Sequence, residues 1–118
     1  MSIRACLTVT ATVALLGCGL RVGTIPLSGP YPPRPADAEV LVWTVDTPEC
    51  PFEELGLTTA RAGLGVRSVE VLVAGMKQEA RRLGGDALVG LRAAPRREGG
   101  AWGYSATVVR FSNEECRS

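Results

Sequence analysis

Four cysteines carry the most reactive side chains of this chain: Cys6, Cys18, Cys50 and Cys116. Thiolates bind soft metals, form disulfides and act as nucleophiles. The 118-residue chain contains no histidine. It therefore lacks the Ser-His and Cys-His nucleophile pairs, and it lacks the commonest metal ligand. The sequence predicts a protein that is not an enzyme and holds no cofactor and no metal.

Cys18 follows a short apolar segment of the kind that directs export. One positive charge, on Arg4, precedes twelve uncharged residues over 5–16, whereas a membrane-spanning helix needs about 20 apolar residues. A basic start, a short apolar stretch and a small residue at its end are typical of a secretory signal. The sequence Leu15-Leu16-Gly17-Cys18 resembles the lipobox of bacterial lipoproteins.

The lipobox resemblance implies that residues 1–17 are a signal peptide, cut before Cys18. The Cys18 thiol would then carry a diacylglyceryl group, and the new amino group would usually be acylated, with fatty acids such as palmitate. Two or more acyl chains anchor a protein stably in a membrane. The resemblance places the protein in the cell envelope, and Gly19 favours the outer membrane where there is one. An ordinary cleaved signal and an N-terminal core strand are the alternatives.

Removal of residues 1–17 leaves 101 residues, enough for one domain. Arg4 is the only charged residue removed, so the 13 basic residues fall to 12 and balance the 12 acidic ones. A net charge of zero argues against a nucleic-acid partner. Five prolines between 19 and 38 argue against a helix or a central strand there. We expect the lipidated cysteine and a Pro-rich tether over 18–38, and one globular α+β domain over 39–118.

Cys50 and Cys116 are the two thiols left in the exported domain. In an oxidising compartment such a pair is usually a disulfide, which would contribute about 4 kcal/mol of stability. The spacing motifs of structural zinc are absent. A thiol-based redox or metal-handling role for the two cysteines is the alternative function. Five glutamates lie near the two cysteines: Glu49, Glu53, Glu54, Glu114 and Glu115. They could form a metal-binding Cys/Glu cluster or a pair of carboxylates, although a run of charges is more often a solvated surface.

The segment between the last two predicted strands is a candidate contact loop. It places Arg96 and Arg97 near Trp102, and arginine with tryptophan is the composition of many interaction surfaces. The loop would touch a protein, glycan or lipid partner. The alternative is an ordinary exposed loop with Trp102 folded back onto the core.

One helix and four strands are the elements that must position these groups. Apolar residues at helical spacing predict a helix over 67–83, with Ser68 as its N-cap and Gly84-Gly85 as its stop. The predicted fold is an antiparallel β-β-α-β-β sheet with one amphipathic helix packed across it. Runs rich in β-branched and aromatic residues predict the strands, over 40–45, 52–59, 86–93 and 104–111.

The end of the predicted helix and the two strands after it are similar to a pattern in a group of small bacterial domains. The matching stretches are Leu83-Gly84-Gly85-Asp86-Ala87-Leu88-Val89-Gly90 and Val109-Arg110-Phe111. The group includes the YbjQ-like family and the lipoprotein sensor of the Rcs envelope-stress phosphorelay, and the resemblance covers roughly 50–111. It implies an α+β domain, with disulfides in some members, oligomers in some, and heavy-metal binding as a description of part of the group.

The sequence therefore predicts an exported, lipid-anchored envelope protein that acts as a non-catalytic interaction or sensor module. Its expected partners are the membrane, through the lipid anchor, and an envelope protein or glycan.

Overall fold

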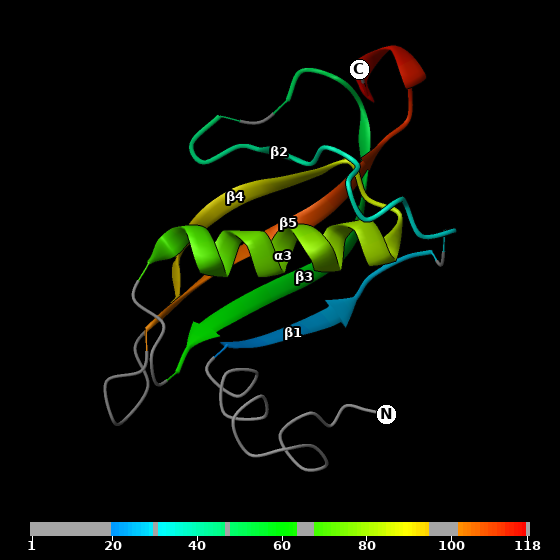
Figure 1. The fold of residues 1–118 in the computed structure, drawn as a ribbon. Helices are drawn as coiled ribbons and strands as arrows, with labels where there is room; N and C mark the ends of the chain where they lie inside the picture. The colour runs from blue at the N-terminus through cyan, green and yellow to red at the C-terminus, as the bar shows by residue number, and fades with distance from the viewer. Residues whose placement is uncertain (1–19, 30, 47, 64–67, 95–101, 118) are drawn as a thin grey trace.

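A five-stranded sheet carries one helix across one of its faces in the computed structural model of the chain (Figure 1). The structure describes residues 20–29, 31–46, 48–63, 68–94 and 102–117. The α+β class and the packing of one helix against a mostly antiparallel sheet confirm the predicted fold class. The elements, in chain order, are β1 (Leu20–Pro26), β2 (Leu41–Val42), β3 (Phe52–Ala62), α3 (Val69–Leu83), β4 (Ala87–Ala94), β5 (Gly103–Phe111) and the 3-10 helix η1 (Glu114–Arg117).

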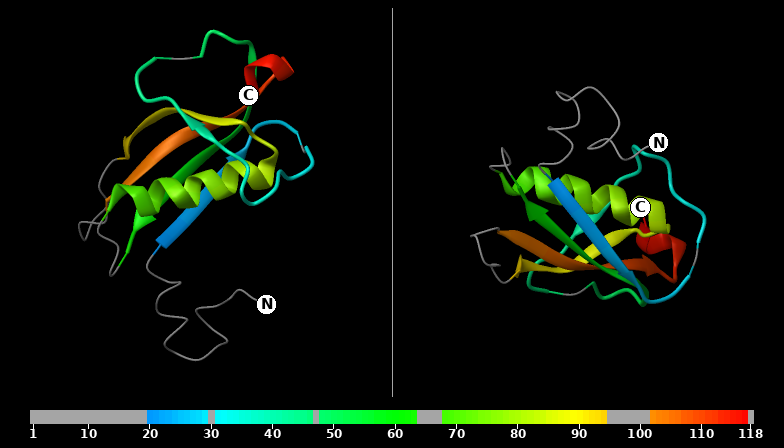
Figure 2. Two further views of the ribbon diagram at one scale, coloured as in Figure 1. Left: turned by 45° about the horizontal axis from the view of Figure 1, so that its top comes forward. Right: turned by 90° about the horizontal axis from the view of Figure 1, so that it is seen from below.

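The strands lie in the order β1-β3-β5-β4-β2. The pairs β1 with β3, β3 with β5, and β5 with β4 are antiparallel, whereas β2 runs parallel to β4. Helix α3 covers one face of the sheet, as the view from below in Figure 2 shows. The sheet thus differs from the predicted one at its two edges, which are formed by β1 and β2.

The predicted strand over 40–45 shortens to β2, which has two residues. Leu41 pairs with Ala87 and Val42 with Leu88, and the Trp43 N–H adds a hydrogen bond of 2.8 Å to the Leu88 carbonyl. Residues 44–46 are exposed. The apolar run that indicated a long strand instead divides its side chains between two cores.

Strand β1 corrects the expected tether over 18–38. Residues 20–26 pair in full with β3, from Leu20 opposite Ala62 to Pro26 opposite Gly56. Of the five prolines in the segment, the first ends β1, at the edge of the sheet, where a missing N–H is tolerated. The prolines therefore limit where the strand ends without excluding an edge strand.

Residues 31–38 also belong to the folded domain. The Arg34 N–H donates to the Arg81 carbonyl at 2.8 Å, and the Arg34 guanidinium pairs with Asp86 at 3.4 Å. Asp86 is only 5% exposed, and its carboxylate also accepts a hydrogen bond of 2.9 Å from the Phe111 N–H. A buried carboxylate needs such partners to offset its lost hydration. The polar contacts of Arg34 thus fix this segment across the end of the helix.

Helix α3 confirms the predicted helix, with its first residue at Val69. Ser68 precedes the helix in an extended conformation, without a side-chain capping hydrogen bond. At the other end Gly84 adopts φ +83°, and Gly84 and Gly85 donate to the carbonyls of Arg81 and Ala80. This is the Schellman arrangement, which favours glycine because it requires the left-handed conformation. The side chains that the helix buries are those of Leu72, Met76 and Ala80.

Two cores lie on opposite faces of the sheet because neighbouring residues of a strand point to opposite sides. Leu88 and Val108 belong to the core under α3. Ala87, Val89, Val109 and Phe111 belong to a smaller core on the other face, which also contains Leu41, Trp43, Phe52 and both cysteines. This second core covers only one end of that face, and none of the helices that the structure describes lies over the other end.

Candidate functional site

Cys50 and Cys116 lie together in the second core. Their sulfur atoms are at disulfide distance, and their Cα atoms are 6.3 Å apart. The pair links the residues just before β3 to η1, which follows β5, and it packs with Phe52 and Phe111. Among the described residues there is no group of three or more cysteine, aspartate or glutamate side chains that could hold a metal ion.

The other predicted site residues have different outcomes. Cys18, Arg96 and Arg97 lie outside the residues that the structure describes, so the lipidation site and the contact loop stay predictions. Trp102 is half-buried and packs against the core under α3. Its ring meets that of Tyr104 edge to face, with centroids 6.4 Å apart. This placement agrees with the alternative in which Trp102 folds back onto the core.

Of the predicted glutamates, Glu53 takes part in a contact between segments. The Tyr31 hydroxyl donates a hydrogen bond to the Glu53 carboxylate. This bond raises the pKa of Tyr31 and lowers the pKa of Glu53. The Arg110 guanidinium lies over the Tyr31 ring, 4.4 Å from its centroid. The group joins residue 31 to β3 and β5, which is a structural role.

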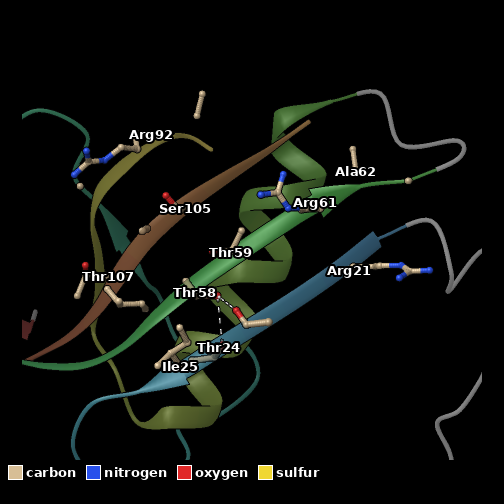
Figure 3. Close-up of a pocket in the computed structure, with 16 residues that line it drawn as sticks. Arg21, Thr24, Ile25, Thr58, Thr59, Arg61, Ala62, Arg92, Ser105 and Thr107 are labelled. Carbon is tan, nitrogen blue, oxygen red and sulfur yellow. Dashed lines mark hydrogen bonds between the residues drawn. The ribbon is translucent and has the colours of Figure 1, made fainter. Parts of the chain in front are cut away.

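A groove of about 960 Å³ lies on the face of the sheet opposite α3, at the end that the second core leaves uncovered (Figure 3). Its lining comes from β1, β3, β4 and β5. In Figure 3 the helix lies behind the strands, so the view is directly onto this open face.

The strand register places the lining residues of the groove in rows across the sheet. In the first row Arg21 of β1 stands opposite Arg61 of β3. The second row runs Gly23, Thr59, Ser105 and Arg92, and the third runs Ile25, Leu57, Thr107 and Val89. Because Leu20, Val22, Ala60 and Ala62 pack into the core under α3, their neighbours Arg21, Gly23, Thr59 and Arg61 face the groove.

A β-bulge brings Arg92 into the second row. The register between β4 and β5 shifts between Val89 and Arg92, and Gly90 in the bulge has φ +68°. Such a left-handed bulge residue favours glycine. The shift lets Leu91 pack with the core under α3 and leaves Arg92 in the lining of the groove. Without the bulge, strict alternation would point Arg92 toward the helix side.

The floor of the groove is made of small residues. Gly23, Thr59 and Ser105 occupy adjacent positions of the second row, and a Cβ atom added at Gly23 would meet nothing within 4 Å. Arginines on three different strands, Arg21, Arg61 and Arg92, belong to the same lining, and Arg21 and Arg92 extend toward opposite sides of the groove (Figure 3). The small residues thus form the floor between arginines of different strands.

The groove is positively charged. Its lining, within the described part of the chain, contains three arginines and no aspartate or glutamate. Arg21 and Arg61 occupy directly opposite positions of β1 and β3. Next to the charges, Ile25 and Leu57 form an exposed apolar pair, 63% and 43% exposed.

The side chains of the groove supply hydrogen-bond donors and hydroxyl groups that can bind a ligand. Guanidinium groups make paired hydrogen bonds to carboxylates and phosphates, and Thr59, Ser105 and Thr107 supply hydroxyls. Among the described lining residues there is no cysteine, tyrosine or carboxylate. The sequence patterns did not predict this site. The sequence carries only a weak local signal for it, in Arg21-Val22-Gly23 and Thr59-Ala60-Arg61. In each stretch the middle residue is apolar and the two outer ones are polar or glycine, so a strand would point them to opposite faces.

Comparison of the chain with protein-family models, curated proteins and solved structures finds no significant match. No helix within the described ranges is both long enough and apolar enough to span a membrane. The groove and the sequence around Cys18 are therefore the features that bear on function.

Proposed function

We propose that this protein is an exported, lipid-anchored binding module of the cell envelope, and that the groove on its open sheet face takes an anionic ligand. The module is non-catalytic, and Cys18 carries its anchor. The observation that carries the proposal is the groove lining, in which the described residues include Arg21, Arg61 and Arg92 beside a floor of small residues, and no carboxylate.

The basic side chains of the groove support an anionic ligand because they gather on one surface. The chain from Cys18 onward has equal numbers of basic and acidic residues. The groove therefore brings basic side chains together on one surface of a chain whose charges balance overall. A local excess of one sign, on a surface with low-dielectric walls, attracts ligands of the opposite sign. An overall neutral protein with one such surface fits a specific binding site better than nonspecific attraction to polyanions.

The position of β1 supports the anchor. The first strand that the structure describes, β1, begins at Leu20, two residues after Cys18. Removal of residues 1–17 would leave every described strand of the sheet intact. Cleavage before Cys18 is therefore compatible with the fold, as the lipobox resemblance requires.

Metabolic labelling with palmitate in cells tests the anchor. We expect the wild-type protein to incorporate label and to stay in the membrane fraction, because its acyl chains hold it there. Cys18→Ser should abolish incorporation, whereas the matched change Cys6→Ser, in the segment to be removed, should leave it unchanged. Undiminished labelling of the Cys18→Ser variant would contradict the proposal.

A further inference from the structure

We propose that the groove binds the headgroups of anionic phospholipids in the same membrane that holds the Cys18 anchor, so that the open face of the sheet lies against the bilayer. This inference rests on the proposed function, and it names the ligand class of the same groove. It also assigns the domain an orientation on the membrane.

The short distance along the chain from Cys18 to the groove is the first argument. Only Gly19 separates Cys18 from β1, and two residues span at most about 7 Å when fully extended. Arg21 follows one residue later. An acylated Cys18 lies at the surface of the bilayer, so the first row of the groove must lie close to the lipid headgroups.

The register shows that all three arginines lie near this end of the sheet. Arg61 stands opposite Arg21 in the first row, and Arg92 belongs to the second row. Rows that line one face are two residues apart, which corresponds to about 7 Å along a strand. The start of β1 and the C-terminal η1 lie at opposite ends of the sheet (Figure 1). The arginines therefore gather at the anchored end, and the cysteine pair lies at the far end.

The chemistry of the groove fits a phospholipid surface. A guanidinium group binds phosphate through two parallel hydrogen bonds, and Arg21 and Arg92 bring such groups to the lining of the groove. The exposed pair Ile25 and Leu57 lies on the same face. Apolar side chains beside basic ones are typical of surfaces that settle into the boundary between headgroups and acyl chains.

A second copy of the chain fits the groove poorly. In a two-fold interface the same patch meets itself, so the arginines of one groove would face those of the other. Among the residues that the structure describes, the groove lining of a second copy offers no carboxylate that could meet these arginines. Charge complementarity therefore favours an anionic surface over a dimer.

Nuclear magnetic resonance of the full processed protein in lipid nanodiscs tests the inference. The protein is purified from the membrane fraction in detergent and placed in nanodiscs of phosphatidylcholine with a rising share of phosphatidylglycerol. We expect the backbone amide signals of Gly23, Thr59 and Ser105 to shift with the share of phosphatidylglycerol. The signals of Asn113 and Glu115, at the far end of the domain, should not move.

A matched pair of double variants tests the role of the arginines. In Arg21→Gln with Arg92→Gln, the apparent affinity for phosphatidylglycerol should fall about 30-fold, because each arginine near an anionic surface contributes a factor of about five. The control removes the same charge from α3, in Lys77→Gln with Arg82→Gln, and should keep the shifts. Unchanged thermal unfolding of the groove variant confirms that its sheet is intact.

Three results would overturn the inference. The first is an absence of shifts in the groove with phosphatidylglycerol, and the second is equal shifts in both double variants. The third is a groove that responds to added inorganic phosphate, or to an acidic peptide, in phosphatidylcholine nanodiscs but not to phosphatidylglycerol. That last result would leave the proposed anion-binding function standing. If Cys18 carries no anchor, the purified protein will lack acyl groups, and this will be seen before the nanodisc experiment begins.

Discussion

Replacement of Cys50 and Cys116 by alanine should remove a large part of the stability of the domain. The pair lies 66 residues apart in the sequence. A link across a loop of that length lowers the chain entropy of the unfolded state and contributes about 4 kcal/mol. For a domain of this size each kcal/mol corresponds to about 4–8 °C in the unfolding midpoint. The double variant should therefore unfold roughly 15–30 °C below the wild type.

The assay is urea and thermal unfolding of three samples: oxidised wild type, wild type with reductant, and the Cys50→Ala, Cys116→Ala variant. If the link acts mainly on the unfolded chain, the reduced protein and the variant should unfold together, well before the oxidised protein. The urea dependence of the unfolding free energy should also become steeper without the link, because a less constrained unfolded chain exposes more surface.

Titration of free thiols in the native protein completes this test. We expect no reactive thiol before reduction and two after it in the chain without Cys6 and with an acylated Cys18. Equal midpoints with and without reductant would refute the entropy argument. Two reactive thiols in the oxidised native protein would refute the pairing itself and would favour the redox or metal-handling alternative.

The remaining predictions concern α3. Leu72 is fully buried, so Leu72→Ala should lower the free energy of unfolding by about 2–5 kcal/mol in urea. Its neighbour Val71 is 44% exposed, and Val71→Ala should change the free energy of unfolding by less than about 0.5 kcal/mol. Equal losses of stability in the two variants would contradict the packing of the helix. Hydrogen bonds from Arg82 lower the pKa of Glu79. The stability that Glu79 contributes is therefore present above its unfolded pKa, about 4.3, and is lost as the pH falls through its lower folded pKa. Glu79→Gln should flatten the acid side of a plot of unfolding midpoint against pH, and curves that stay parallel down to low pH would contradict this.

Local patterns predicted most of the elements of the fold. The apolar residues of 69–83 repeat at helical spacing, and Gly84 supplies the left-handed end of the helix, so the helix could be found without knowing its partners. The strands over 86–93 and 104–111 were placed within one residue at each end. The pairing of Cys50 with Cys116 followed from counting the cysteines left after export.

The edges of the sheet could not be predicted in this way because they depend on pairing between distant segments. In β1 three inward residues, Leu20, Val22 and Thr24, alternate with exposed ones, but a seven-residue alternation beside five prolines is a weak signal. Its pairing with β3 across some 40 residues is what makes it a strand. Five prolines in one segment suggested a tether, although only Pro26 falls within the strand.

The groove could not be predicted from the sequence for the same reason. Arg21, Arg61 and Arg92 are far apart in the sequence and stand on three different strands. They lie around one hollow only because β1 pairs with β3 and because a bulge in β4 reorients Arg92. The loop with Arg96 and Arg97 attracted attention in the sequence because its charges are adjacent there. In the folded sheet, the strand register decides which side chains are neighbours.

The mass of the N-terminal peptide of the processed protein, taken from the membrane fraction, tests the central claim most directly. The account predicts a peptide that begins at Cys18 and carries a diacylglyceryl group on its thiol. A peptide that begins at another residue, or at an unmodified Cys18, would contradict the anchor and, with it, the orientation of the groove toward the bilayer.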